Sequence, residues 1–292
     1  MFSGAITALI TPMKQDGAVD LAALRNLVEF QIAEGIDGLV PCGTTGEAST
    51  LSLEERAQVI KTTVEQARGR VPVIAGAGAN TTPAAVAGSK MAREAGADGV
   101  LQVTPFYNKP GPAGLLAHFR AASQATALPL VVYNVPSRTG CDMQPSTVAP
   151  IAALPNVVGI KEATGSIVRG QQVIAACPPD FVVLSGDDPT ALALTAVGGR
   201  GVISVVSNIA PGPMARMIRD ARQGRLEQAR VLNYTLLPLM ELLFVESNPI
   251  PVKAAAALMG YGANALRLPL TPLAEEHVGP LRQELQRQGL LP

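Results

Sequence analysis

The stretch Val157-Val158-Gly159-Ile160-Lys161-Glu162 decides the fold class, because a short apolar run ends abruptly in two charged residues. A run of this length is typical of a β-strand buried on both faces, as the strands of a parallel sheet are. In enzymes built on parallel sheets, the carboxyl ends of the strands carry the chemistry. The stretch therefore predicts a parallel α/β fold with Lys161 at a functional edge.

Seven further apolar runs of this kind recur along the first two thirds of the chain. They are Ala5–Ile10, Gly38–Pro41, Val71–Ala75, Gly99–Val103, Leu130–Tyr133, Phe181–Leu184 and Gly201–Val205. Amphipathic segments lie between them, so strands and helices are expected to alternate. Helices are predicted to begin after Asp20, behind a capping box of Ser52 and Glu55, and after Thr82 as the N-cap, with Pro83 in the first helical position.

Eight strands that alternate with helices fit either a (β/α)8 barrel or a doubly wound sheet. The even repeat favours the barrel, and no nucleotide-binding fingerprint follows the first strand. The stretch Gly76-Ala77-Gly78-Ala79-Asn80-Thr81 approaches such a fingerprint, but it has Thr81 in place of the third glycine and follows the third run. We therefore expect a (β/α)8 TIM barrel over residues 1–224.

Beyond residue 224 the apolar patterns become helical. The expected helices are Leu226–Phe244, Pro251–Met259 and His277–Arg287. Residues 225–292 are therefore predicted to form a C-terminal helical domain that packs on the barrel.

The composition excludes several classes of protein. The 292 residues carry 23 Lys+Arg against 23 Asp+Glu, so no net charge attracts nucleic acid or an anionic membrane. No stretch approaches the roughly 20 apolar residues of a membrane span, and the first ten residues lack the basic segment of a signal peptide. Cys42, Cys141 and Cys177 are odd in number and form no CxxC pair, which speaks against disulfides and structural zinc. We expect a cytoplasmic protein that binds neither nucleic acid nor membranes.

The chain has only two histidines, His118 and His277, and they are far apart. His118 lies in a predicted helix, where a structural role is the simpler interpretation. Metal hydrolases, zinc-dependent aldolases and serine hydrolases depend on histidine. The chemistry is therefore expected to rest on lysine, tyrosine, threonine or carboxylate groups, with neither a metal nor a cofactor.

Lys161 is the most informative of these residues. Burial of an ammonium group is costly, so its pKa should fall and its amine should become a nucleophile toward a carbonyl. Two other interpretations stand beside this one, an ion pair with Glu162 and a lysine that extends out of the barrel mouth to solvent. Lys253 is a rival lysine, but it opens a helix outside the barrel repeat.

Hydroxyl and charged groups follow the other strands. Tyr133 and Tyr107 lie at strand ends and, with Thr44, could move protons where histidine is scarce; alternatively Tyr107 is an exposed loop residue and Tyr133 a core residue. Arg138 either clamps a carboxylate or caps a loop. The Gly43-Thr44-Thr45-Gly46 turn offers N–H groups and hydroxyls suited to a small carboxylate.

Asp187 and Asp188 follow the seventh strand, close to where many barrels bind phosphate. Two acidic side chains there argue against a phosphorylated substrate. Carboxylic acids are therefore the expected substrate class.

Six motifs in order resemble the pyruvate-dependent class I aldolase family over essentially the whole chain. They are GTTGE at 43–47, TPFYNKP at 104–110, YNVPSRTG at 133–140, GIKEATG at 159–165, SGDD at 185–188 and NPIPVK at 248–253. The resemblance is greatest to those members that condense pyruvate with L-aspartate 4-semialdehyde, the first committed step of the diaminopimelate route to L-lysine.

The resemblance implies a role for each matching residue. Lys161 would form the imine with pyruvate, and Tyr133, Thr44 and Tyr107 would relay protons, Tyr107 from a neighbouring subunit. The family's pattern further implies a homotetramer built as a dimer of dimers. The residues implied to bind substrate are Thr45 for the pyruvate carboxylate, Arg138 for the semialdehyde carboxylate, and Gly186 and Ile203 at the pyruvate site.

Arg138 separates the close alternatives. N-acetylneuraminate lyase and the 2-keto-3-deoxy sugar acid aldolases share the lysine and the tyrosine but generally lack this arginine. A catalytically silent barrel that only binds pyruvate is a further alternative.

One set of positions departs from the pattern of lysine-inhibited members. They commonly have His, His, Glu and Tyr where this chain has Leu53, Arg56, Ala84 and Phe106, although Asn80 is retained. Weak or absent inhibition by L-lysine is therefore expected.

Overall fold

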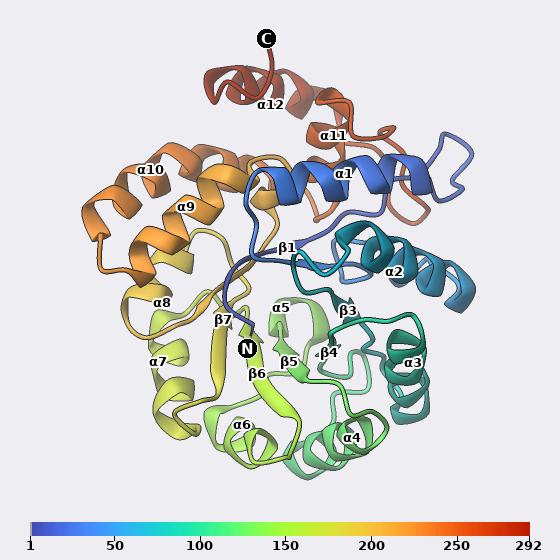
Figure 1. The fold of residues 1–292 in the computed structure, drawn as a ribbon, viewed down its shortest axis with the longest axis vertical. Coiled ribbons are helices and arrows are strands. Elements are labelled where there is room, and N and C mark those ends of the chain that lie inside the picture. The colour runs from blue at the N-terminus through green and yellow to red at the C-terminus, as the bar shows by residue number, and fades with distance from the viewer. Residues whose placement is uncertain (1) are drawn as a thin grey trace.

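The computed structural model describes residues 2–292 and shows a parallel eight-stranded barrel inside a ring of helices (Figure 1). The strand order is β2-β1-β8-β7-β6-β5-β4-β3, and a parallel bridge between Leu39 and Val73 joins the two ends of the sheet. The expected (β/α)8 barrel is thereby confirmed. The strands are β1 Gly4–Ala8, β2 Gly38–Val40, β3 Ile74–Gly76, β4 Gly99–Val103, β5 Leu130–Asn134, β6 Val157–Glu162, β7 Val182–Ser185 and β8 Gly201–Ser204.

All eight predicted strands are present, and β4 has the predicted bounds. The third strand is shorter than expected, because only Ile74–Gly76 pair with β4, in register with Gly99–Leu101. Val73, two residues after the predicted start, pairs only at the bridge that closes the barrel.

Helices follow the strands around the barrel, as the amphipathic segments predict. They are α1 Leu21–Ala33, α2 Leu53–Ala67, α3 Thr82–Glu94, α4 Pro112–Gln124, α5 Pro136–Thr139, α6 Pro145–Ala152, α7 Ile167–Ala176, α8 Ala191–Ala196, the 3-10 turn η1 Val206–Asn208, α9 Pro211–Arg222, α10 Leu226–Leu242, α11 Ile250–Leu258 and α12 Glu275–Arg287.

Two of the predicted helix caps form as expected, and one is displaced. The Asp20 side chain accepts hydrogen bonds from the first turn of α1, and the Ser52 and Glu55 capping box is complete in α2. The prediction for α3 was wrong by one residue. Thr81 is the cap, and its hydroxyl accepts from the N–H of Ala84. Both threonines can cap a helix, and the chain uses the one with extended backbone.

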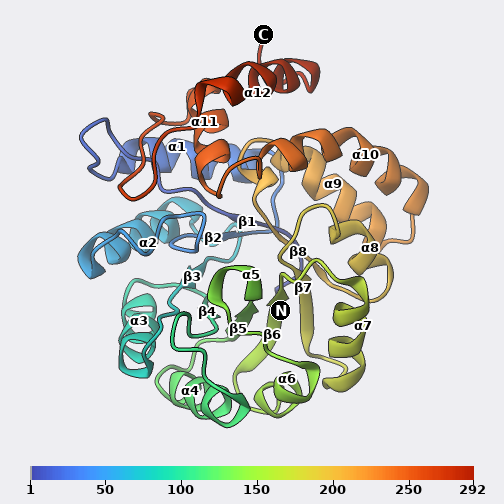
Figure 2. The same cartoon turned by 180° about the vertical axis from the view of Figure 1, so that it is seen from behind.

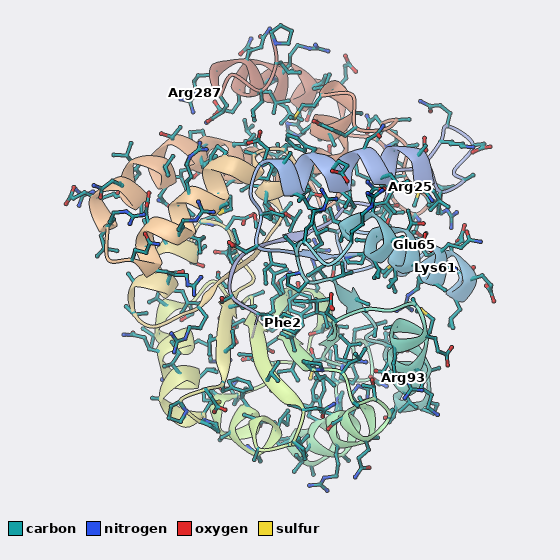
Figure 3. The ribbon with its side chains drawn as sticks, in the orientation of Figure 1. Phe2, Arg25, Lys61, Glu65, Arg93 and Arg287 are labelled. Atoms are coloured by element: carbon teal, nitrogen blue, oxygen red, sulfur yellow. The ribbon has the colours of Figure 1, made fainter. Side chains whose placement is uncertain are left out.

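Apolar side chains fill the barrel itself as well as the layer between strands and helices. Phe2 lies at the centre of the ring in Figure 3 and is buried in this interior group. Tyr133 and Ile203 belong to the same group. Residues with roles at the carboxyl ends of strands are therefore held from below by a packed core.

The last three helices lie along one side of the barrel, and the C-terminus lies at that edge (Figure 2). Helix α10 packs on α9, and α12 packs on both α10 and α11. Helix α9 ends at Arg222 and α10 begins at Leu226, close to the predicted boundary at residue 224. The division of the chain into two domains there stays a prediction. Across residues 2–292, none of the helices combines the length and apolar character that crossing a membrane requires.

Candidate active site

Lys161 and Tyr133 are neighbours across two strands. They pair in register between β6 and β5, and the Lys161 Nζ lies 4.4 Å from the centroid of the Tyr133 ring. The lysine is only 5% exposed. No carboxylate lies within ion-pair distance of its amine among the ion pairs found over residues 2–292.

Burial changes the acidity of this amine. It lowers the pKa of Lys161 to about 8; the charge of Asp188 opposes the change and that of Arg138 adds to it. Roughly a tenth of the amine is then neutral at pH 7, far more than for an ordinary lysine. The two other interpretations of Lys161 are wrong, because the side chain is buried and Glu162 instead bonds to the Asn134 amide.

Tyr133 shows the opposite change in pKa. Burial raises the pKa of its phenol to about 12, while the charge of Arg138 and the hydroxyl of Thr44 act in the lowering direction. The phenol therefore keeps its proton at neutral pH and can act as a donor. Its ring is packed in the core, as the core interpretation expects. Its role in proton transfer stays a prediction.

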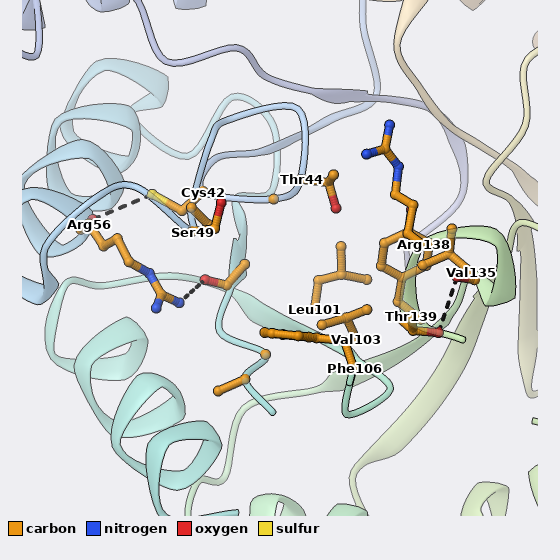
Figure 4. A pocket seen from close by; sticks show the side chains of 16 residues that line it. Cys42, Thr44, Ser49, Arg56, Leu101, Val103, Phe106, Val135, Arg138 and Thr139 are labelled. Carbon is orange, nitrogen blue, oxygen red and sulfur yellow. Dashed lines mark hydrogen bonds between the residues drawn. The ribbon is translucent and has the colours of Figure 1, made fainter. Parts of the chain in front are cut away.

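Thr44, Tyr133 and Arg138 line one cavity of about 470 Å³ at the barrel mouth (Figure 4). Apolar side chains of β4, Leu101 and Val103, line it as well. Lys161 is not a lining residue, and its amine lies against the Tyr133 ring, which is. A small carboxylic acid fits a cavity of this size.

The Gly43-Thr44-Thr45-Gly46-Glu47 turn follows β2 and is fixed from two directions. The Thr45 hydroxyl accepts a hydrogen bond of 2.9 Å from the Asn248 amide, and Thr11 donates to the carbonyl of Gly46 at 2.7 Å. Glu47 has a positive φ of 54° without being glycine. Such backbone is strained and persists where the surroundings hold it.

A buried ion pair holds the end of this turn. The Lys253 Nζ lies 2.5 Å from the Glu47 Oε1, with side chains 1% and 0% exposed. The Arg267 N–H donates to the other Glu47 oxygen at 3.2 Å. Burial lowers the pKa of Lys253, and the charge of Glu47 opposes that change. Lys253 is thus committed to a partner, which leaves Lys161 as the candidate nucleophile.

Arg138 stands in the short helix α5, directly after β5. One Nη donates to the carbonyl of Asn248 at 3.1 Å, and Asn248 also bonds to Thr45. Asn248 therefore links the arginine to the GTTGE turn. A guanidinium has five N–H donors, so this contact leaves donors for a carboxylate.

Gly186 directly follows β7, and Ile203 lies on β8. A Cβ on Gly186 would stand 2.6 Å from the Ala163 Cβ and 2.9 Å from the Lys161 Cε, closer than real Cβ atoms approach. Glycine therefore leaves room for Ala163 and Lys161. Ile203 is buried on β8 within the barrel interior.

Tyr107 lies apart from the other predicted catalytic residues and does not line its own chain's cavity. It is 89% exposed, with a φ of 73°. Phe106, its neighbour, does line the cavity. The exposed-loop interpretation and the shared-subunit interpretation of Tyr107 both stand.

Three contributors to the site are not evident from the sequence. Asn248 and the pair of Glu47 and Lys253 stand within the motifs, but no spacing rule connects Asn248 to Thr45 or Lys253 to Glu47 across some 200 residues. Asp188 is buried, and one of its oxygens accepts both 2.9 Å hydrogen bonds from backbone N–H groups. Its signal was an acidic residue directly after a strand, at the catalytic edge.

His118 has the structural role expected of it. It is buried in α4, and its Nδ1 lies 3.0 Å from the Thr82 hydroxyl. Burial lowers its pKa.

Comparison with known proteins gives a consistent result. A sequence model of the dihydrodipicolinate synthetase family matches residues 1–288. The 4-hydroxy-tetrahydrodipicolinate synthase of Maridesulfovibrio salexigens is 54% identical over 291 residues, which is 99% of both chains. A chloride-inhibited dihydrodipicolinate synthase from Acinetobacter baumannii, solved as a complex with pyruvate, is 48% identical with a TM-score of 0.98 over 100% of both chains. The enzyme from Cyanidioschyzon merolae, solved with lysine bound, is 40% identical with a TM-score of 0.96 over 99% of both. The resemblance found in the motifs is confirmed over the whole length.

Proposed function

This chain belongs to the dihydrodipicolinate synthetase family, and on that premise we propose that it condenses pyruvate with L-aspartate 4-semialdehyde to 4-hydroxy-tetrahydrodipicolinate. The observation that carries the proposal is the buried Lys161, which has a lowered pKa, lacks an ion-pair partner within residues 2–292, and lies against a phenol that keeps its proton. A buried, neutral amine at the mouth of a barrel is the requirement for Schiff-base chemistry. The product lies on the diaminopimelate route to lysine.

The first half of the reaction consumes pyruvate at Lys161. The neutral amine attacks the C2 carbonyl, and loss of water with uptake of one proton gives the cationic imine. Loss of a proton from the methyl group then gives the enamine. The Tyr133 phenol and the Thr44 hydroxyl are placed to carry these protons. Thr45, together with the N–H groups of the turn, would hold the pyruvate carboxylate.

The second half forms the carbon–carbon bond. The enamine carbon attacks the aldehyde carbon of the semialdehyde, and the aldehyde oxygen takes up a proton from the relay. The amino group of the adduct then attacks the imine carbon, closes the ring and returns Lys161 to the free amine. Arg138, which lines the cavity and retains free donors, would bind the semialdehyde carboxylate.

Exposed apolar side chains support an oligomer. Tyr107 is 89% exposed, next in the chain to Phe106, which lines the cavity. Val168 on α7 and both Val231 and Tyr234 on α10 are also exposed on outer helices. A dimer of dimers needs surface of this kind at its interfaces. We place Tyr107 of one subunit in the site of its partner. Three free cysteines are compatible with the cytoplasmic location proposed.

A coupled assay tests the function directly. The purified protein is given pyruvate and L-aspartate 4-semialdehyde, and the product is followed with a nicotinamide-dependent reductase. Turnover that vanishes in Lys161→Met supports the proposal. Cleavage of N-acetylneuraminate or of a 2-keto-3-deoxy sugar acid, without consumption of the semialdehyde, would assign the chain to a sugar-acid aldolase instead, and no turnover with any of these would leave a pyruvate-binding barrel.

A further inference from the structure

Asp188 is a buried carboxylate with an incomplete set of partners. It lies in the loop between β7 and α8 and is 3% exposed. Its Oδ2 accepts the N–H groups of Val205 and Val206, each at 2.9 Å. Its Oδ1 is buried and has no hydrogen-bond partner within residues 2–292. A buried carboxylate in this condition is costly unless a cation lies within its field.

The other charged groups around Lys161 are directed elsewhere or have the wrong sign. On its own strand, Glu162 bonds to the Asn134 amide at 3.1 Å and to the N–H of Thr164 at 2.8 Å. In the loop after β7, Asp187 bonds to the hydroxyl of Thr190.

The β5 side supplies no anion either. Tyr133 presents a ring face to the amine and retains its proton, and Arg138 is itself a cation. In the GTTGE turn, Glu47 is paired with Lys253. Asp188 is therefore the anionic group whose field acts on Lys161.

We propose that Asp188 is a positioning residue, the counter-ion of the cationic nitrogen that Lys161 carries once it has condensed with pyruvate. The inference rests on the proposed function. A neutral amine reacts with the ketone, but the imine that results must be protonated to draw electrons from the methyl carbon. That charge arises in a buried site beside Arg138, where an unmatched cation is strongly disfavoured. The unpartnered Asp188 oxygen supplies the opposite charge.

The electrostatics of the resting site agree with this role. Burial raises the pKa of Asp188, and the Ser204 hydroxyl and the N–H groups of Val205 and Val206 act in the lowering direction without cancelling that change. At Lys161 the same carboxylate opposes the lowering of the pKa by burial. A positive charge on the imine nitrogen would reduce the cost of burying the Asp188 carboxylate, and the carboxylate would in turn stabilise the buried cation.

Asp188→Asn removes the charge and keeps an oxygen that can accept from Val205 and Val206. The pyruvate concentration for half-maximal trapping by borohydride is measured by intact mass between roughly pH 6 and 10, together with the pH profile of kcat/KM. We expect that pyruvate concentration to rise about tenfold. We also expect the midpoint of the Lys161 titration in the pH profile to fall by about one pH unit, because the amine no longer has a carboxylate that stabilises its charged form. Asp187→Asn is the matched control, with an unchanged midpoint, and Asp188→Glu is expected to restore trapping.

The outcomes separate the inference from the function. Absence of a pyruvate-dependent adduct in the unmodified protein would remove the proposed function itself. Normal trapping with an unshifted midpoint in Asp188→Asn would show that Asp188 only fastens the β7 and β8 loops, even if thermal unfolding of the variant occurs earlier. Should Asp188→Asn fail to fold, Asp188→Ser is measured in the same way and is expected to show the same shift.

Discussion

Lys161 and Tyr133 have opposite acid–base tendencies for the same physical reason. Burial penalises whichever form carries a charge, so it lowers the pKa of the lysine to about 8 and raises that of the tyrosine to about 12. Burial away from solvent thus makes the amine nucleophilic and keeps the phenol as a proton donor. Both residues were predictable, because each directly follows an apolar strand run. The effect of Asp188 on Lys161 was not predictable, because Asp188 is held by the N–H groups of Val205 and Val206, and no local pattern connects these positions.

The pH dependence of kcat/KM for pyruvate follows from the Lys161 pKa. Below about pH 8 the amine is mostly protonated, so the rate constant should rise about tenfold per pH unit and level off above the pKa. Because Tyr133 titrates only near pH 12, no loss from the phenol is expected before the protein is strongly alkaline. Steady-state rates across the pH range check this, and a flat profile between pH values of roughly 6 and 8 would contradict it.

Removing the Tyr133 hydroxyl tests the relay. Tyr133→Phe keeps the ring under the Lys161 amine and removes the group that interacts with Thr44. We expect kcat to fall by about 10²–10⁴, with little change in the stability of the protein. Steady-state kinetics and thermal unfolding measure the two effects, and a variant that retains most of its kcat would exclude Tyr133 from proton transfer.

At the scale of elements, the C-terminal segment acts on the barrel mouth rather than standing apart from it. Helix α11 brings Lys253 to Glu47. Asn248, which lies just before α11, bonds to both Thr45 and Arg138. Local pattern predicted the C-terminal helices, and two of the three predicted caps, at Asp20 and Ser52, are present. The contacts between α11 and the turn join residues some 200 positions apart, which no local pattern specifies.

Lys253→Met should destabilise the protein by about 3–5 kcal/mol, because Glu47 is left buried without its partner. Adding Glu47→Gln should recover part of this loss. Lys61→Met is the control, since Lys61 and Glu65 form an exposed pair at 3.8 Å on the outer face of α2 (Figure 3) and contribute less than about 1 kcal/mol. Urea unfolding measures all three, and equal effects of Lys253→Met and Lys61→Met would refute the assignment.

For the whole molecule, the exposed Tyr107 next to Phe106, which lines the cavity, fits an assembly in which sites are shared. The barrel was predictable from the even repeat of the eight strand runs and from the lack of a nucleotide-binding fingerprint after the first of them. The placement of Tyr107 is not readable from one chain, since the residue projects into solvent there.

A hybrid dimer tests the shared site. Tyr107→Phe and Lys161→Met subunits are each expected to have low activity alone. Co-expressed, they form hybrids in which one site has both an intact lysine and the partner's intact tyrosine. Random pairing should restore about one quarter of the normal activity. Activity no greater than the sum of the separate variants would place Tyr107 outside the partner's site.

Inhibition by L-lysine is expected to be weak or absent. Leu53 and Ala84 offer no polar partner to an amino acid, and Arg56, which donates to the carbonyl of Gly76 at 2.8 Å, repels its ammonium groups. The steady-state rate should be unchanged at lysine concentrations of about 1 mM, on the scale of ordinary metabolite affinities. Clear inhibition at lower concentrations would show that another set of contacts binds lysine.

Borohydride trapping followed by peptide mass spectrometry tests the central claim most directly, because it identifies the nitrogen that bonds to pyruvate. With pyruvate present, the account predicts one reduced pyruvate adduct per subunit on the peptide that contains Lys161, and none without pyruvate or in Lys161→Met. An adduct on Lys253 or another lysine, or no pyruvate-dependent adduct at all, would contradict it.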